Sequence, residues 1–300
     1  MRQPGFRCRD REAYSPAFPP DRKAAVAGSR LFMRGAMLAA WSAGTYITAL
    51  ICAATATAQS EQDLAKQLAN PIANLISVPL QLNYDHDLGR DDKGDRYLLN
   101  VQPVVPIDLN SDWLLISRTI VPFISQDDVA PGEGSQFGIG DTVQSLFFSP
   151  KSSGHLTWGA GPVFLLPTST EDTLGARKWG AGPTGVALVQ EGPWTYGGLV
   201  NHIWSFAGDG ERDRVSQTFL QPFLNYTTSS ATTFFLNTES TYDWEAEKWS
   251  IPINFGVNQL FTIGEQKVQI GGGLRYWAES PDTGAEGWGG RINLVFLFSA

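Results

Sequence analysis

Three features of the sequence predict an all-β fold, namely an antiparallel transmembrane outer-membrane β-barrel of about twelve strands with a short N-terminal helix. The first feature is an export signal, the second is a series of long β-rich runs, and the third is an alternation of long and short connections. A soluble sandwich would also alternate polar and apolar residues, but its strands are shorter. The three features together therefore favour the barrel.

The first 58 residues predict export. Residues 33–58 contain an early Arg, an apolar stretch and the small-residue ending Ala56-Thr57-Ala58, which is the pattern of a cleaved signal peptide. Residues 1–32 match nothing in such a signal, and we interpret them as a non-functional extension upstream of a start at Met33 or Met37. The alternative is a membrane anchor, which the Ser and Thr residues of the stretch disfavour.

The exported part is acidic and contains no cysteine. Cys8 and Cys52 both precede residue 59, so disulfides cannot hold the fold together. Of the 22 basic and 30 acidic residues in the whole chain, 14 and 27 follow residue 58, which gives a net charge of −13. Binding to nucleic acid depends on Lys and Arg at phosphates, so nucleic acid is not expected as a partner.

One short helix precedes twelve strand-like runs. Residues 59–71 predict a periplasmic helix or an inner plug, with Leu64 and Leu68 on one helical face. Residues 72–300 predict the barrel, because their runs are rich in β-branched and aromatic residues and long enough to cross a bilayer when tilted. The runs lie at 74–85, 96–108, 113–126, 136–149, 155–167, 178–190, 194–206, 215–228, 231–243, 248–261, 265–278 and 287–298.

The connections between the runs alternate in length. Long ones are expected at 86–95, 127–135, 168–177, 207–214 and 279–286, whereas the connections between them are short turns. Residues 244–247 fit the long class poorly. Outer-membrane barrels have short periplasmic turns and longer external loops, so both chain ends are expected on the short-turn side.

Alternation within the runs predicts a polar lumen. Charged groups on strands that cross lipid are expected to face inward, because exposing an Arg at the bilayer midplane costs roughly 2–4 kcal/mol. These side chains are candidates for setting selectivity, or alternatively for bracing a closed interior with ion pairs. The lumen candidates are Gln81, Asn83, Asn100, Gln102, Arg118, Gln217, Gln221, Asn237, Glu239, Asn254, Gln269, Arg275, Arg291 and Asn293.

Tryptophans near the ends of the runs predict an aromatic belt at both membrane interfaces. The pentapeptide WGAGP occurs at residues 158–162 and again at 179–183, and we interpret the repeat as membrane geometry rather than as a ligand motif. The belt is expected to contain Trp113, Trp158, Trp179, Trp194, Trp204, Trp249, Trp277 and Trp288.

The sequence offers little catalytic or metal-binding chemistry. His86, His155 and His202 are the histidines, and Ser205 is placed on the opposite strand face from His202. The acidic stretch 85–95 lacks the spacing of a calcium loop, and no glycine-rich phosphate loop is present. We therefore expect no enzyme activity, no metal and no cofactor.

Many segments resemble one group of Gram-negative outer-membrane transporters. The resemblance rests on NPIANLISVPLQLNYD (70–85), GIGDTVQSLFFSP (138–150), WGAGPVFLLPT (158–168) and QEGPWTYGGLVNHIWSFAG (190–208) among other segments, and it covers essentially the whole of 62–298. The group is classed with proteins named for the meta-cleavage pathway of phenol degradation and often carries the misleading label neuromedin U. The resemblance implies a monomeric-type barrel distantly like channels for hydrophobic substrates. The chain departs from the usual ending, because two residues follow Phe298, where recognition by the barrel assembly machinery favours a terminal aromatic residue.

The sequence therefore predicts an outer-membrane channel for the passive passage of small molecules, aromatic or hydrophobic ones among them. Expected partners are outer-membrane lipid, lipopolysaccharide bridged to the acidic loops by divalent ions, the assembly machinery and a small-molecule solute. The alternative is a non-conducting structural or surface-interaction barrel, and an outer-membrane lipid hydrolase is a third, more distant reading.

Overall fold

The computed structural model describes residues 61–129, 134–152 and 154–298. The predicted signal peptide and the extension before it lie outside the described residues, as do Gln59 and Ser60 at the start of the predicted helical segment. Residues 61–68 form a helix, and the regular structure that follows is β-strand. Within these three ranges, no helix is long and apolar enough to cross a membrane.

The strands begin and end close to the predicted runs. In chain order they are β1 (Ile76–Leu88), β2 (Gly94–Val101), β3 (Val104–Asp108), β4 (Trp113–Asp127), β5 (Gln136–Ile139), β6 (Thr142–Pro150), β7 (Leu156–Leu166), β8 (Lys178–Glu191), β9 (Trp194–Gly208), β10 (Ser216–Thr227), β11 (Thr232–Thr238), β12 (Ser240–Asp243), β13 (Lys248–Ile263), β14 (Gln266–Glu279) and β15 (Gly287–Phe298).

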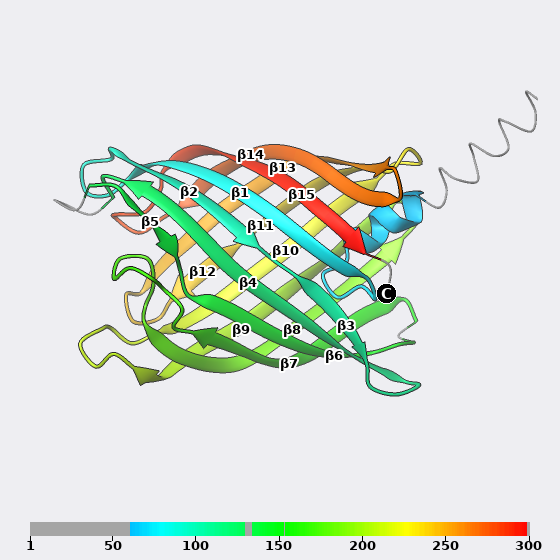
Figure 1. Cartoon of the computed structure of the whole chain (residues 1–300), viewed down its shortest axis with the longest axis horizontal. Helices are drawn as coiled ribbons and strands as arrows, with labels where there is room; N and C mark the ends of the chain where they lie inside the picture. The colour runs from blue at the N-terminus through cyan, green and yellow to red at the C-terminus, as the bar shows by residue number, and fades with distance from the viewer. Residues whose placement is uncertain (1–60, 130–133, 153, 299–300) are drawn as a thin grey trace, which may run out of the picture. The chain divides into compact units, whose positions relative to one another are not determined.

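These segments form a closed antiparallel barrel of twelve strands in the described part of the chain (Figure 1). Three barrel strands are interrupted, so that β2 with β3, β5 with β6, and β11 with β12 each make one crossing. The barrel closes where β1 pairs with β15, from Ile76 opposite Phe298 to Tyr84 opposite Gly290. The predicted fold class is confirmed.

The interruptions occur where a backbone N–H is missing or is used elsewhere. Pro103 separates β2 from β3 and has no N–H to donate. Glu239 separates β11 from β12, and Pro222 on β10 and Pro252 on β13 flank it, so the ladder is weakened on both sides. At the β5–β6 break, the N–H of Thr142 donates to Thr168 Oγ1, and the Asp141 carboxylate accepts loop N–H groups, those of Ser169, Ala176 and Arg177.

The long connections gather at one end of the barrel and the short turns at the other. The predicted long loop at 86–95 is tighter than expected, because β1 continues to Leu88 through a bulge after Asp85 and β2 already begins at Gly94. The helix lies at the short-turn end, beside the end of β15 (Figure 1).

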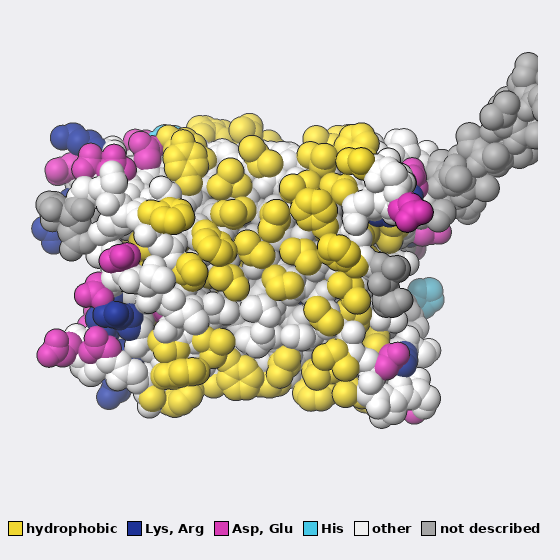
Figure 2. All heavy atoms as spheres, in the orientation of Figure 1, with side chains coloured by type: hydrophobic (Ala, Val, Ile, Leu, Met, Phe, Trp, Pro, Cys, Tyr) yellow, Lys and Arg dark blue, Asp and Glu magenta, His cyan; other side chains and the backbone are white. Residues whose placement is uncertain are grey.

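The outer surface is apolar across its middle. Figure 2 shows hydrophobic side chains over the central part of the visible face, whereas acidic and basic side chains gather at the two ends. Outward-facing Leu236, Leu274 and Ile292 are 46%, 50% and 57% exposed, which would be unfavourable against water. A closed sheet with this outer surface fits a lipid bilayer, where every backbone group must be paired within the protein. The barrel is therefore placed in the outer membrane.

The two WGAGP segments lie side by side on β7 and β8. Pro162 pairs directly with Pro183, and Trp158 and Trp179 lie toward opposite ends of the barrel. A β-carbon on Gly161 would overlap the carbonyl oxygen of Leu146, and one on Gly182 would overlap that of His202. The second glycine of each copy is therefore required because the neighbouring backbone approaches closely at that point.

Replacing either close-contact glycine is expected to destabilise the barrel. Gly161→Ala and Gly182→Ala should each lower the free energy of unfolding by about 1–3 kcal/mol, because the neighbouring strand must shift to admit a methyl group. Gly185→Ala is the matched control on β8, since the nearest atom to its added β-carbon is 3.9 Å away. Urea unfolding of the refolded protein in lipid vesicles, followed by tryptophan fluorescence, measures all three, and equal midpoints would contradict the explanation.

Candidate functional site: the lumen

All fourteen predicted lumen side chains occupy inward-facing positions of the barrel. Residues directly opposite in an antiparallel sheet share a face, so the register assigns them together. Gln81 lies opposite both Asn100 and Asn293, and Asn254 lies opposite both Asn237 and Arg275. The others face inward by the same registers: Asn83, Gln102, Arg118, Gln217, Gln221, Glu239, Gln269 and Arg291. Their role in selectivity stays a prediction.

Glu239 is the acid at the centre of the lumen. Its two carboxylate oxygens accept hydrogen bonds from both terminal nitrogens of Arg291, at 3.0 and 2.6 Å. The third donor of Arg291, Nε, reaches Asn83 Oδ1 at 2.8 Å, and the Arg291 side chain is only 2% exposed. This bidentate geometry is the strong form of an ion pair, and it fixes the guanidinium rigidly against the wall.

A second acid, Asp85, lies one step further toward the long loops. Its Oδ1 atom lies 3.1 Å from Arg275 Nε, in an ion contact whose N–H is not aligned for a hydrogen bond. Arg96 approaches Asp85 Oδ2 at 3.5 Å, and Arg275 also reaches Glu239 at 3.9 Å. Because Arg275 contacts both acids, the two ion pairs form one network that joins β1, β2, β14 and β15 to the break between β11 and β12.

Trp277 belongs to this network, and its predicted place in the outer belt is wrong. The indole Nε1 donates to Asp85 Oδ1 at 2.8 Å, and the guanidinium carbon of Arg275 lies 4.7 Å from the centre of the ring. Trp277 keeps the strand register of Arg275, two residues before it, and therefore shares its inward face; the β13–β14 bulge comes only beyond Trp277. The sequence contained a signal for this, because Trp277 follows the inward-facing Arg275 by two residues and alternate residues of a strand share a face.

The other belt tryptophans lie on the outer face. Trp113 and Trp158 contact each other edge to face at 6.1 Å, and Trp194 contacts Tyr226 at 4.8 Å. Amphipathic rings of this kind suit the boundary between lipid and water. The remaining outward tryptophans are Trp179, Trp204, Trp249 and Trp288, on β8, β9, β13 and β15.

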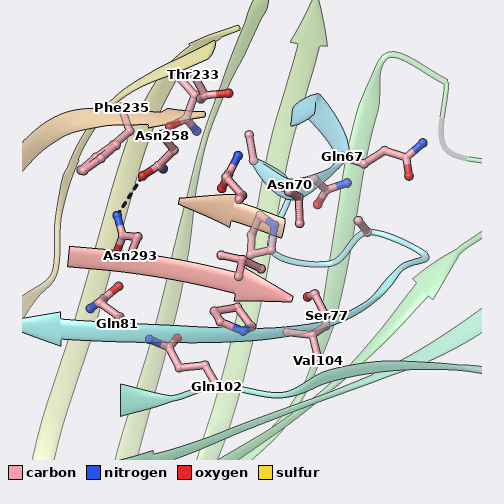
Figure 3. Close-up of a pocket in the computed structure, with 18 of the residues that line it drawn as sticks. Gln67, Asn70, Ser77, Gln81, Gln102, Val104, Thr233, Phe235, Asn258 and Asn293 are labelled. Carbon is pink, nitrogen blue, oxygen red and sulfur yellow. Dashed lines mark hydrogen bonds between the residues drawn. The ribbon is translucent and has the colours of Figure 1, made fainter. Parts of the chain in front are cut away.

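The lumen contains a cavity of about 210 Å³ below the ion network, which we call the chamber. Figure 3 shows amide side chains from many strands pointing into it, with Asn293 donating to Asn258 at 3.1 Å. Ten amide side chains contribute to the lining: Gln67, Asn70, Gln81, Gln102, Gln221, Asn225, Asn237, Asn258, Gln269 and Asn293. Amides both donate and accept hydrogen bonds, so this lining can hold water or a polar solute in several orientations.

Residues 61–75, which we call the inner segment, close the chamber at the short-turn end. Gln62 donates to Thr227 O at 3.2 Å, and Gln190 donates to Lys66 O at 2.8 Å. Ile72, 3% exposed, packs among inward-facing apolar side chains of the wall. A second apolar cluster docks the segment on the other side, where fully buried Ala65 packs against Leu260, Val295 and Leu297. Leu64, Leu68 and Leu75 of the segment pack against the same cluster, so the segment is held by these apolar contacts together with a few hydrogen bonds.

One side of the lumen is apolar, which the sequence analysis did not predict. Its buried residues come from the inner segment, β3, β4, β6, β8 and β9, and they are Ile72, Val104, Leu114, Ile116, Phe147, Val186, Leu188 and Leu199. The signal for this side was available, because β8 carries apolar or small residues at both parities from Trp179 to Val189, unlike the alternating runs of β1 and β13. The lumen thus combines a polar, charged half with an apolar half.

His202 lies on the outer face, away from the lumen. Its Nδ1 atom is 2.7 Å from Thr218 Oγ1, its ring is 4.0 Å from that of Trp204, and Trp244 Nε1 donates to the same Thr218 hydroxyl. No carboxylate in the described ranges contacts this imidazole. No group of three or more His, Cys, Asp or Glu that could hold a metal occurs among the described residues.

Comparisons with known proteins support the fold. No family model and no curated protein sequence matches the chain. An outer membrane channel from Pseudomonas putida F1 superposes with a TM-score of 0.58 at 13% identity, covering 75% of this chain and 96% of that one. The family resemblance seen in the sequence stays a prediction, and at this identity the similarity establishes the barrel fold alone.

Two further outer-membrane barrels are similar at lower scores. The β domain of the Bordetella autotransporter BrkA has a TM-score of 0.43 at 10% identity and covers 75% of this chain and 100% of that one. Outer membrane phospholipase A from Escherichia coli has a TM-score of 0.42 at 11% identity and covers 74% and 92%. Neither supports an argument about activity.

Removing the central acid is expected to destabilise the barrel strongly. Glu239→Gln leaves two buried guanidinium groups without their shared counter-charge, and breaking a buried pair from one side costs about 3–5 kcal/mol. Glu279→Gln, at the exposed end of β14, is the control and should change stability little. Urea midpoints of the refolded proteins test the difference. Adding Arg291→Gln to Glu239→Gln should recover part of the loss, and strict additivity of the two changes would refute the coupling.

Docking of the inner segment is expected to weaken in acid. Hydrogen bonds from Lys267 Nζ at 3.1 Å and from Thr262 at 2.9 Å hold the pKa of Glu61 below its usual value of 4.5. A lowered pKa contributes stability that is present above the ordinary value and is lost as the pH falls through the lowered one.

The variant Asp63→Cys introduces the sole cysteine after residue 58, and a fluorescent dye can be attached to it. The fluorescence anisotropy of the dye is high while the inner segment is docked and falls when the segment is released. The anisotropy should fall as the pH drops below about 4.5. In the Glu61→Gln background it should be lower and independent of pH in that range. A parallel acid response in both proteins would assign the effect to another group.

Proposed function

We propose that the protein is an outer-membrane channel through which small molecules pass passively, aromatic or hydrophobic ones among them. The observation that carries the proposal is an amide-lined chamber inside a closed barrel, closed at the short-turn end by the inner segment, which packs against the wall through side chains. A barrel that serves only as a scaffold gains nothing from a lining of ten amides, since apolar side chains would fill the same interior at lower cost.

The two halves of the lumen support passage of molecules with apolar parts. Phe219 and Phe223 of β10 pack against the apolar half, and the ion network occupies the opposite wall. A solute between them can bury its apolar surface on one side while its polar groups meet amides on the other. Sites of this composition, apolar with a few convergent polar groups, are typical of small-molecule binding.

The inner segment is the part of this passage that must move. Its helix spans only residues 61–68, and an isolated helix of that length is marginal in water. Its position therefore depends on docking, to which both Ile72 and the cluster around Ala65 contribute. Truncating a side chain such as Ile72 to Ala in a packed core costs about 2–5 kcal/mol. Displacing it would connect the chamber with the short-turn end.

Permeation should increase when this docking is weakened. The refolded protein in liposomes should admit small neutral solutes in a swelling assay, and Ile72→Ala should raise the rate several-fold. Ile107→Ala is the matched control, because Ile107 is 45% exposed on the outside of β3 near the same end.

Absence of swelling and of ion conductance in both the unaltered protein and Ile72→Ala would favour the alternative reading of a non-conducting structural barrel. Equal increases in Ile72→Ala and Ile107→Ala would show that general loosening, rather than release of the inner segment, admits the solutes.

A further inference from the structure

The chamber is cationic although the chain as a whole is acidic. Among the described residues that line it, the charged side chains are Arg118 and Arg291, and no Asp or Glu lines it. Both acids of the ion network, Asp85 and Glu239, lie outside the lining. The acidic long loops lie at the far end of the barrel, where water and salt screen their charges within about 8–10 Å. A solute in the chamber therefore meets positive charge first.

The two arginines differ in how far their charges are compensated. Arg291 donates from Nε to Asn83 and from both terminal nitrogens to Glu239, so all three of its nitrogens already have a partner within the protein. Arg118 donates from one terminal nitrogen to Gln102 Oε1 at 2.9 Å, and no ion pair joins it to a carboxylate of the described chain. A largely buried guanidinium held by one neutral amide keeps most of its capacity to bind an anion.

The wall across the chamber from Arg118 is aromatic. Arg118 stands on β4, whereas Phe223 and Phe235 line the chamber from β10 and β11, five and six barrel strands further around. Asn225 pairs with Phe235 and Phe223 pairs with Asn237, so rings and amides alternate on this wall. A ligand that spans the chamber would meet a cation at one end and apolar rings at the other.

The size of the chamber limits the ligand. About 210 Å³ is below the roughly 300–1,000 Å³ of sites that take drug-sized molecules, and it would hold about seven waters at ~30 Å³ each. A small monocarboxylate with a compact apolar body combines this size with the charge and the surface. A planar carboxylate also matches the two parallel N–H donors of a guanidinium.

We propose that the chamber is a binding site for small organic monocarboxylates, with Arg118 pairing with the carboxylate and the Phe223–Phe235 wall packing against the apolar body. The inference rests on the proposed channel function and specifies its substrate class. Arg118 is thereby the specificity-determining residue, and Arg291 serves the wall of the barrel.

Equilibrium binding to the full-length refolded protein in detergent micelles tests the proposal. Three probes separate its parts, because benzoate has both a carboxylate and an apolar body, benzamide lacks the charge, and acetate lacks the ring. Isothermal titration should show benzoate binding at least tenfold more tightly than either of the others. Equal affinity for benzamide, equal affinity for acetate, or no binding of benzoate would each overturn the proposal.

Variants then locate the site. Arg118→Gln should weaken benzoate binding at least tenfold, whereas Arg118→Lys should retain part of it because the charge remains. Arg90→Gln is the matched control, since it removes the same charge from an exposed position between β1 and β2. Heat-modifiable gel mobility verifies folding of each variant. Equal losses in Arg118→Gln and Arg90→Gln, or none in Arg118→Gln, would refute the assignment.

This binding measurement is independent of transport. A protein that binds benzoate but passes neither ions nor solutes contradicts the channel function and leaves the site in place. A protein that conducts but binds benzoate no better than benzamide contradicts the site and leaves the channel function in place.

Discussion

Closure of the hydrogen-bonded sheet is the constraint on which the rest of the structure depends. In hydrocarbon no water can satisfy an exposed backbone group, so the pairing of β1 with β15 must complete the ring. This requirement determines which side chains face lipid and which face the lumen, because successive residues of a strand point to opposite faces of the closed sheet. It also explains why the interruptions beside Pro103 and Glu239 are short, and why Asp141 binds the N–H groups of a loop where β5 passes into β6.

Closure creates an interior whose width suits neither a fully packed core nor an open water-filled pore. Barrels of about eight strands fill with side chains, and those of sixteen or more enclose water. The twelve described strands lie between these limits, and the interior is divided accordingly. Ile72 and the apolar residues around it fill one half, while the amides and the ion network leave a chamber in the other.

The ion network determines which buried arginines have a carboxylate partner, including those that line the chamber. Glu239 holds Arg291 and contacts Arg275, and Asp85 holds Arg275 and approaches Arg96, so most of the buried positive charge is compensated within the wall. Arg118 is close enough to Glu239 to interact electrostatically but has no ion-pair contact of its own. The same set of charges therefore braces the barrel and leaves Arg118, one of the two arginines that line the cavity, without a carboxylate partner. The two interpretations of the lumen charges, selectivity and bracing, thus apply to different arginines.

The sequence by itself determined the strand count, the ends of most strands and the inward face of the fourteen polar candidates, because these follow from local period, run length and the cost of charge in lipid. Only the tertiary structure decided what depends on register and distance between strands. It decided that Trp277 reaches Asp85 inside the barrel, because β15 pairs with both β14 and β1 and so brings these two strands close together. It also decided that the second glycine of each WGAGP copy lies against a neighbouring carbonyl oxygen. It decided, finally, that Glu239 forms its ion pair with Arg291, whereas Arg118 donates to Gln102. A one-dimensional pattern gives the face of a residue, whereas the partner it meets across a closed barrel depends on strands far apart in the chain.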